Sequence, residues 1–304
     1  MFLKPPKAST DQRVRSLLQK ATRRGYVQVV DNAFMRLDIS GDKSWLRSRA
    51  VVITFEECWP LAASLFIDRE PSSKRHVLLS VAKAAKQKDA AGLGALAYAY
   101  HEGDRSMLDC IPDHQVLRIV SEALRRPTAF FGWVLKQSKV ERSSKVILNA
   151  QQYLSAATWQ WDKATILAGA LLATIGDMPM IEPASNLSEE FPYWIALDKH
   201  TPQGKLVLRE IVSMVNASYR QLIWTSFYCE SARVNRLLSS PWWEAERAWR
   251  LRRAGLSLEL AEELWSRARS LVCKHLESEA LSLKKFVNAI PSSYTAPTQN
   301  KLPY

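Results

Sequence analysis

The sequence predicts an all-α protein built from many short helices packed antiparallel. Apolar residues recur at helical spacing along most of the 304-residue chain, and glycine is scarce, with 10 residues in total. No run alternates apolar and polar residues between Asn-Gly or Asp-Gly turns, so little of the sequence is compatible with a sheet. Hydrophobic residues make up 47% of the chain and charged residues 24%, which is typical of a packed globular protein rather than a disordered or fibrous one.

Three helices are predicted near the N-terminus. Apolar residues share one face between residues 14 and 21 and again between 27 and 37, and Gly25 is the expected end of the first helix. Gly41-Asp42 offers a turn and an N-cap for a third helix, which Trp59-Pro60 is expected to end. Further helices are expected near residues 74–88, 91–101, 114–125, 128–140, 142–175, 204–239, 241–254 and 258–288.

A domain boundary is predicted between Gly176 and Glu190, where Asp, Pro, Asn and Ser residues cluster after a long helical run. It divides the chain into a first helical region, 1–176, a second helical region, 177–288, and a flexible tail, 289–304, that contains three prolines. A long loop within a single helical domain is the alternative interpretation.

The motifs that the sequence lacks exclude several classes of protein. The four cysteines stand more than 40 residues apart, and no Cys or His pair has metal-ligand spacing. The nearest match to a P-loop, residues 201–206, lacks the first glycine and the hydroxyl residue, and GxSxG and HExxH are absent. Residues 164–175, the most apolar stretch, fall short of the roughly 20 that cross a bilayer, and the N-terminus lacks the apolar run of a secretion signal. We expect a soluble, cytoplasmic protein with no cofactor and no ATPase activity, in which 164–175 is a buried helix.

The chain carries 42 Lys and Arg against 30 Asp and Glu, a formal net charge of +12. Basic residues cluster on the first and third predicted helices. A phosphate backbone favours such clusters, because each neutralised phosphate releases counterions. A solvated face that keeps the protein in solution is the alternative. The candidate nucleic-acid contacts are Arg13, Arg15, Lys20, Arg23, Arg24, Arg47 and Arg49.

Residues 198–205, Asp-Lys-His-Thr-Pro-Gln-Gly-Lys, form the densest polar group in the sequence. A functional interpretation pairs Asp198 with His200 for proton transfer and uses Lys199 and Lys205 to hold an anion at the start of the next helix. The structural interpretation, which we favour, makes Thr201 an N-cap followed by proline at the first helical position. The candidate residues of this motif are Asp198, Lys199, His200, Thr201, Gly204 and Lys205.

The adjacent carboxylates Glu56-Glu57 are a second candidate, as an acid/base couple or a cation site. Neighbouring helix positions point about 100° apart, so the two side chains cannot easily share one proton.

Eleven tryptophans are many for this length. Trp242-Trp243, together with Trp249 and the nearby arginines, can form a stacking platform for single strands beside a basic groove. Helical spacing and apolar neighbours favour core or subunit-interface packing instead.

Residues 16–62 begin Ser-Leu-Leu-Gln-Lys-Ala-Thr-Arg-Arg-Gly and continue, after a helix, with Gly41-Asp42, Trp45-Leu46-Arg47-Ser48-Arg49 and Glu56-Glu57-Cys58. This segment resembles the opening of the C-terminal region of the replication-associated recombination protein A family, clamp-loader-like AAA+ ATPases that include the Werner-helicase-interacting protein. Residues 194–205 resemble an Asp-x-His-Thr-x-x-Gly-Lys signature of shortened relatives of that region.

The resemblance implies a helical collar-like fold, self-association as a tetramer, and work at replication forks or single-strand gaps, with a place beside the nucleoid. The AAA+ module that hydrolyses ATP has no counterpart in this chain, so ATPase activity is not carried over. Cys58-Trp59-Pro60 stand where the family has acidic and glycine residues, which puts any shared contact after Glu57 in doubt.

The leading functional hypothesis is a non-enzymatic accessory protein of DNA replication or recombination. Its expected partners are single-stranded or forked DNA, further copies of itself and a replication AAA+ ATPase, with no membrane; DNA is not distinguished from RNA. An adaptor, a decoy that mixes with a host oligomer and a replication accessory of a phage or mobile element are equally open. The alternative is a nucleic-acid-acting enzyme with a site around Asp198, His200, Glu56 and Glu57.

Overall fold

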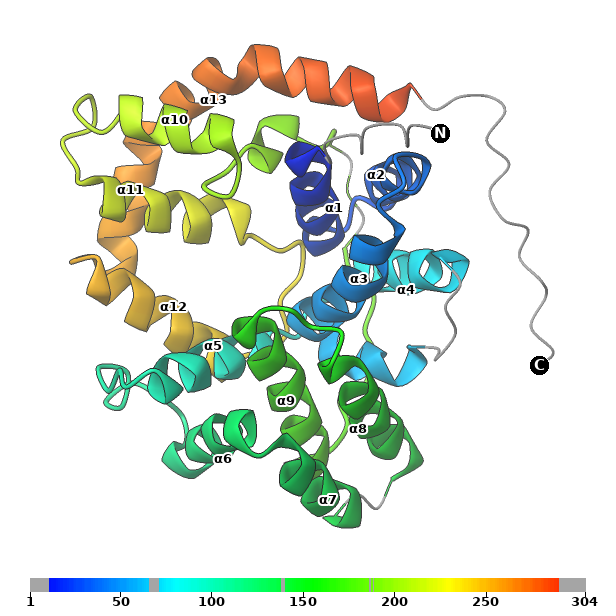
Figure 1. Cartoon of the computed structure of the whole chain (residues 1–304). Helices are drawn as coiled ribbons and strands as arrows, with labels where there is room; N and C mark the ends of the chain where they lie inside the picture. Colours follow the sequence, from blue (N-terminus) through cyan, green and yellow to red (C-terminus); the bar gives the residue numbers. More distant parts are fainter. Residues whose placement is uncertain (1–10, 66–70, 138–139, 186, 188, 290–304) are drawn as a thin grey trace, which may run out of the picture.

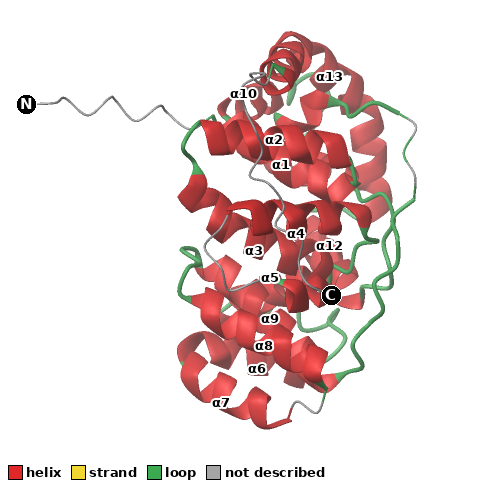
Figure 2. Ribbon diagram, turned by 90° about the vertical axis from the view of Figure 1, so that its right-hand side faces the viewer, coloured by secondary structure: helices red, strands yellow, loops and turns green. Residues whose placement is uncertain are grey.

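The computed structural model describes residues 11–65, 71–137, 140–185, 187 and 189–289 (Figure 1). Within them the regular secondary structure is helical, with no strand beyond isolated bridges, which confirms the all-α prediction (Figure 2). The α-helices are α1 (Gln12–Arg24), α2 (Val27–Ile39), α3 (Lys43–Cys58), α4 (Pro71–Lys83), α5 (Asp89–His101), α6 (His114–Arg125), α7 (Pro127–Gln137), α8 (Glu141–Leu154), α9 (Gln160–Ile175), α10 (Pro202–Glu210), α11 (Tyr219–Ser226), α12 (Pro241–Arg253) and α13 (Leu258–Asn288). Shorter turns are η1 (Trp59–Ser64), η2 (Tyr193–Ala196) and the π-helical η3 (Phe227–Ser231).

The N-terminal helices begin and end close to the predicted positions. Asp11 caps α1 by accepting from the Arg13 N–H at 2.9 Å. Gly25 ends α1 in the left-handed conformation, with φ 83°, where a side chain would be strained. The 3₁₀ turn η1, which begins with Trp59-Pro60, follows the end of α3.

The prediction of one continuous helix over 142–175 and another over 204–239 is wrong, because a loop divides each stretch into separate helices. A loop, 155–159, separates α8 from α9. In the second stretch Asn216 adopts a positive φ of 50°, and Ser218 starts α11 in a capping box with Gln221. Apolar residues continue through both loops, so helical periodicity alone does not locate the breaks.

Residues 84–88, predicted as the end of a helix, lie outside any helix and include three residues in isolated bridges. Their backbone N–H groups donate to the carbonyl oxygens of Glu57, Glu182 and Arg236, so three distant segments meet here. These long-range bonds replace the helical ones beyond Lys83, and they bring Lys88 into the interior.

Two large hydrophobic cores hold the helices together, and a smaller cluster lies where α5, η3, α12 and α13 meet. One large core lies among α5 to α9, η1, α12 and the second half of α3, in the lower part of Figure 1. The other joins α1, α2 and the first half of α3 to α10, α11 and α13, in the upper part of the same view. The second core therefore contains residues from both sides of the predicted boundary at 177–190. The predicted tail lies, apart from Ala289, outside the described residues.

The most apolar stretch is confirmed as helical, and α9 buries every residue from Ala164 to Leu171, while Ile175 at its end is 49% exposed. Across the described ranges, no helix combines the length and the apolar character needed to cross a membrane.

The tryptophans of α12 are core residues. Trp242, Trp243 and Trp249 are 6%, 8% and 0% exposed, which confirms the packing interpretation for these three. They do not form a stacking platform on the outer surface, although Trp243 contributes to the wall of the cavity described next.

Candidate functional site

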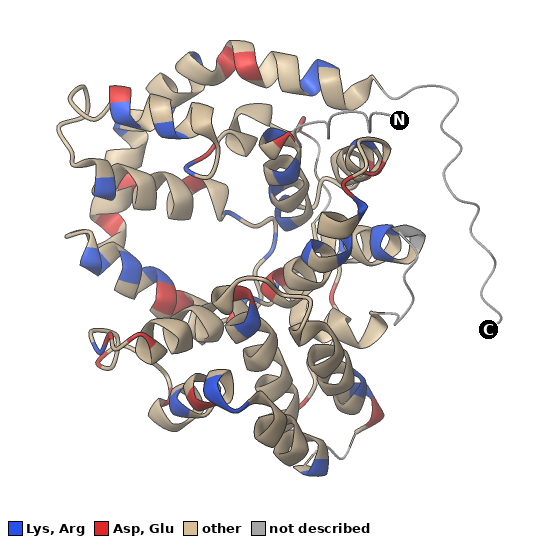
Figure 3. Ribbon diagram, in the orientation of Figure 1, with Lys and Arg blue, Asp and Glu red and all other residues tan. Residues whose placement is uncertain are grey.

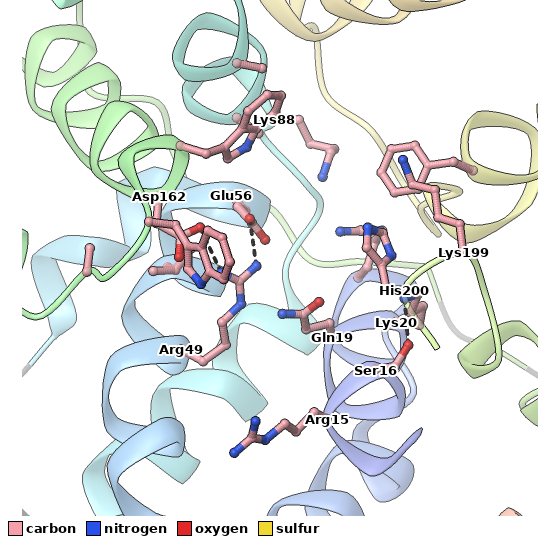
Figure 4. A pocket seen from close by; sticks show the side chains of 18 of the residues that line it. Arg15, Ser16, Gln19, Lys20, Arg49, Glu56, Lys88, Asp162, Lys199 and His200 are labelled. Atoms are coloured by element: carbon pink, nitrogen blue, oxygen red, sulfur yellow. Dashed lines mark hydrogen bonds and ion pairs between the residues drawn. The ribbon is translucent and has the colours of Figure 1, made fainter. Parts of the chain in front are cut away.

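A charged cavity of about 670 Å³ is lined by helices of both cores. It is bounded by α1, α3, α5, α9, α11, η3 and α12, together with Lys88, the loop 155–159 and the turn at 199–200. Figure 4 shows Arg49 and Asp162 on one side of this space and the turn with Lys199 and His200 on the other. The volume lies within the range of about 300–1,000 Å³ that is usual for ligand sites.

The lining is both basic and aromatic. Seven Lys and Arg side chains line it, against three carboxylates: Arg15, Lys20, Arg23, Arg49, Lys88, Lys199 and Arg250, with Glu56, Asp162 and Glu246. The aromatic lining residues are Trp45, Trp159, Trp161, Trp224, Phe227, Tyr228 and Trp243. Positive charge beside flat ring faces suits a ligand that carries both phosphate and an aromatic base.

Arg49 is held at the α3 side of the cavity by two carboxylates. Its guanidinium donates to Asp162 Oδ1 at 2.9 Å and to Glu56 Oε1 at 3.0 Å. Burial works against the charged form, but the two carboxylates outweigh it and raise the pKa of Arg49 above its ordinary value. Arg49 is therefore a fixed cation, oriented from the α9 side as well as from its own helix.

Arg15 is a second oriented cation of the lining. It donates to both carboxylate oxygens of Asp42, at 2.7 and 2.6 Å, and its guanidinium carbon lies 4.9 Å from the centre of the Trp45 ring. Asp42 stands outside the lining, so the guanidinium contributes positive charge to the cavity while its partner stays in the wall.

Glu57 lies in the wall behind the cavity and holds two of its cations. Only 1% of the residue is exposed, and its oxygens lie 2.7 Å from Arg23 Nε and 2.8 Å from Lys88 Nζ. Burial alone would raise its pKa, but the two cations outweigh burial and lower the pKa to about 2. Since Glu56 faces the cavity and pairs with Arg49, the two adjacent glutamates serve different cations and do not form the acid/base couple considered from the sequence.

The turn before α10 is a helix cap, as the structural interpretation predicts. Thr201 Oγ1 accepts from the Gly204 N–H at 3.1 Å and donates to the Asp198 carbonyl at 3.0 Å, and Pro202 opens the helix. A Cβ at Gly204 would lie 2.1 Å from the Asp198 carbonyl oxygen, so only glycine permits this close approach. Lys205 is exposed and does not line the cavity, so it is not placed beside Lys199 to hold one anion.

Asp198 ties this turn to α1. Its carboxylate lies 2.8 Å from Lys20 Nζ and 3.0 Å from His200 Nδ1, so the Asp198–His200 contact considered from the sequence is present. Burial would raise the pKa of Asp198, but Lys20 and His200 outweigh it and hold the pKa well below its usual range. Burial also lowers the pKa of His200 despite the neighbouring carboxylate, while 57% of its side chain stays exposed within the cavity.

Among the described residues, Lys199 is the cavity cation without a carboxylate or hydrogen-bond partner. Its Nζ lies 3.5 Å from the centre of the Trp224 ring and 4.2 Å from that of Phe227. Arg250 approaches the same Trp224 ring, at 5.0 Å. Burial lowers the pKa of Lys199 to about 7; Asp198 opposes this change and Arg250 adds to it.

The neighbouring wall is formed by Tyr228, Glu246 and Arg250. Glu246 Oε1 accepts from the Tyr228 hydroxyl at 2.6 Å and from Arg250 Nε at 3.2 Å. Its other oxygen, Oε2, has no hydrogen-bond partner in the described part of the chain. Tyr228 belongs to the π-helical turn η3, an irregularity that often occurs at functional sites.

The other predicted nucleic-acid contacts do not form one exposed surface. Arg13 pairs with Asp11 and Glu279, and Arg24 pairs with Glu230. Of the whole set, Lys20 and Arg23 are buried and Arg47 is exposed. Figure 3 shows Lys and Arg positions interspersed with Asp and Glu positions along the helices. The predicted basic cluster is therefore divided among ion pairs, the cavity lining and the exposed Arg47.

Sequence reasoning did not select Lys88, Asp162 and Trp224, which also line the cavity. They come from three separate segments, and none of them belongs to a recognisable motif. The sequence is rich in tryptophan and basic residues, but this composition does not show which of these residues lie together in the fold.

No protein-family model, curated protein or solved structure matches this chain. The resemblance of residues 16–62 and 194–205 to the replication-associated recombination family therefore stays a prediction. In the ranges that the structure describes, no group of three or more His, Cys, Asp or Glu side chains is placed to hold a metal ion.

Proposed function

We propose that this protein is a non-enzymatic accessory protein of DNA replication or recombination that holds single-stranded DNA in the charged cavity. The observation that carries the proposal is the lining itself, where oriented guanidinium groups, an unpaired ammonium and seven aromatic side chains surround one space. Phosphates are bound by the cations, and bases stack on the rings, each stacked base contributing about 1–3 kcal/mol.

The size of the cavity favours a single strand over a duplex. A space of about 670 Å³ takes a short stretch of a strand or its end, but it cannot enclose paired strands. Stacking needs unpaired bases, whose faces are covered in a duplex. Forked DNA meets the same requirement through its single-stranded arms, so the cavity suits the substrates that the resemblance implies.

The arrangement of the cations supports anion binding rather than a neutral ligand. Asp42, Glu57 and Asp198 each pair with a cavity cation, yet none of the three lines the cavity. The lining thus keeps a surplus of positive charge, and Lys199 has no carboxylate to compete with a phosphate among the described residues.

Self-association and contact with a replication ATPase belong to the same proposal. An exposed apolar side chain on α8, Leu148 at 49%, is a candidate for such a contact. Sedimentation of the purified protein tests self-association, since a monomer at all concentrations contradicts it.

The proposal is tested by the salt dependence of binding to a labelled single strand and to a duplex of the same sequence. We expect tighter binding of the single strand at about 50 mM salt and a steep loss of affinity by about 200 mM. At about pH 6, below the pKa of about 7 that burial gives Lys199, Lys199→Met should lower the affinity and reduce the salt slope by about one phosphate contact, whereas the exposed Lys205→Met should change neither. Equal binding of both DNA forms, or equal effects of the two substitutions, contradicts the proposal.

A further inference from the structure

Lys199 differs from the other two lysines of the cavity in how its amine is held. Lys20 Nζ lies 2.8 Å from Asp198 and Lys88 Nζ lies 2.8 Å from Glu57. Loss of a proton from either would take one of two partners from a buried carboxylate, which is costly. Among the described residues, only the ring faces of Trp224 and Phe227 contact the Lys199 Nζ. Loss of its proton therefore leaves no carboxylate without a partner.

The surroundings of Lys199 also favour the neutral amine. The side chain is enclosed by aromatic residues, and the Arg250 guanidinium lies over the same Trp224 ring. Burial beside a second cation lowers the pKa to about 7, although Asp198 and Glu246 favour the charged form. An amine in this state is a nucleophile at neutral pH, and lysines that form Schiff bases with carbonyl compounds are activated in the same way.

His200, the next residue in the chain, lines the same cavity and supplies a base. Its Nδ1 lies 3.0 Å from an Asp198 oxygen, and this contact favours the neutral tautomer in which Nδ1 carries the proton. Nε2 is then a free acceptor on a side chain that is 57% exposed inside the cavity.

We propose that the Lys199 amine forms an imine with a phosphate-bearing aldehyde bound in the cavity. The Nζ lone pair attacks the carbonyl carbon, and the π electrons move to the oxygen. The nitrogen of this adduct gives one proton to His200 Nε2, which passes it to the oxygen and so forms the carbinolamine. The nitrogen lone pair then forms the C=N bond as the hydroxyl group leaves, and the second nitrogen proton, carried by His200 Nε2 in the same way, completes the water. Amine and aldehyde thus give imine and water, with no oxidant or reductant.

The aldehyde has two chemical sources that share this reaction. One is an abasic deoxyribose within a DNA strand, whose flanking phosphates fit the basic lining. The other is a free sugar phosphate in its open form. This activity goes beyond the proposed binding of intact single strands, which needs no covalent step.

The test is reductive trapping with sodium borohydride, which converts an imine into a stable amine. The probes are an oligonucleotide with one abasic site, ribose 5-phosphate, and the intact oligonucleotide as the control. We expect a borohydride-dependent adduct with the abasic strand or the sugar phosphate, mapped to Lys199 by peptide analysis, and none with the intact strand. The probe that forms the adduct shows which of the two aldehydes, the abasic strand or the free sugar phosphate, is the substrate.

Two substitutions separate chemistry from folding and from binding. Lys199→Arg keeps the positive charge but cannot form an imine, so the adduct should fall at least tenfold at saturating probe. Lys205→Met, at an exposed lysine outside the cavity, should keep the full yield. Melting temperatures within a few degrees of the native protein show that the variants fold.

An undiminished adduct in Lys199→Arg, or no adduct mapped to Lys199 with either aldehyde, overturns the proposal. Binding of the intact strand is measured separately. Failure of the imine proposal therefore does not contradict the proposed DNA binding, and failure of DNA binding does not contradict imine formation with the sugar phosphate.

Discussion

Lys20 on α1 and Asp198, in the turn before α10, form an ion pair of 2.8 Å whose side chains are only 2% and 5% exposed. The pair joins the N-terminal helices to a turn that lies far along the chain. It also fixes the position of Lys199 and His200, which follow Asp198 directly and line the cavity. One buried contact therefore serves both the fold and the candidate site.

Lys20→Met should destabilise the protein by about 3–5 kcal/mol, because it leaves the Asp198 charge buried without its main partner. Urea unfolding followed by circular dichroism measures the loss. The double variant Lys20→Met/Asp198→Asn should recover part of it, since no unpaired charge remains. A loss below about 1 kcal/mol for the single variant contradicts a structural role for the pair.

Glu57 should make the stability of the protein sensitive to acid. Arg23 and Lys88 outweigh the effect of burial and lower its pKa to about 2 in the folded state, from an ordinary value of 4.5. A carboxyl group whose pKa is lower in the folded state contributes stability that is fully present above about pH 5 and is lost as the pH falls toward 2.

The measurement is the free energy of unfolding between pH 6 and about pH 3, for the native protein and for Glu57→Gln. The native protein should lose more stability over this range than the variant, which lacks the titrating group and is less stable at neutral pH. Parallel curves for the two proteins contradict the role given to Glu57.

Gly204→Ala should be strongly destabilising, because its Cβ would meet the Asp198 carbonyl oxygen at 2.1 Å and push the cap apart. Thr201→Ala removes one capping hydrogen bond and should cost about 1 kcal/mol. Gly132→Ala in α7 is the matched control, since nothing lies within 4 Å of a Cβ there and alanine favours a helix interior. Thermal melts should rank the variants in that order, and equal effects of the two alanine-for-glycine substitutions contradict the close approach at Gly204.

The sequence allowed the all-α class and the local features of the fold to be predicted, because these depend on neighbouring residues. Gly25 as a helix end and Thr201 as a cap followed from short-range rules. The division of the predicted helices at 155–159 and 211–218 did not follow, since both loops remain apolar. There the tertiary contacts, not the periodicity, decide where the helix stops.

The candidate site was less accessible to prediction, because it depends on contacts between distant residues. Arg23 and Arg24 read as members of a basic cluster, yet their partners Glu57 and Glu230 lie 34 and 206 positions away. The sequence shows the charge of each arginine, but it does not show which distant carboxylate pairs with it. Lys199 was selected for its motif, but only the structure shows that it differs from Lys20 in having no carboxylate partner among the described residues.

The central claim, that the cavity holds a single strand by stacking and charge, is tested most directly by comparing two exposed tryptophans. Trp159 lines the cavity and is 69% exposed, while Trp133, on α7 and 41% exposed, does not line it. Neither substitution by alanine should unfold the protein, because both side chains keep much of their surface in solvent.

Affinity for a short labelled single strand at about 50 mM salt is the decisive measurement. Trp159→Ala should weaken binding by about 5- to 150-fold, the equivalent of the roughly 1–3 kcal/mol of one stacked base, while Trp133→Ala leaves it within twofold of the native protein. Unchanged binding by the Trp159 variant, or an equal loss in both variants, contradicts a strand bound in the cavity.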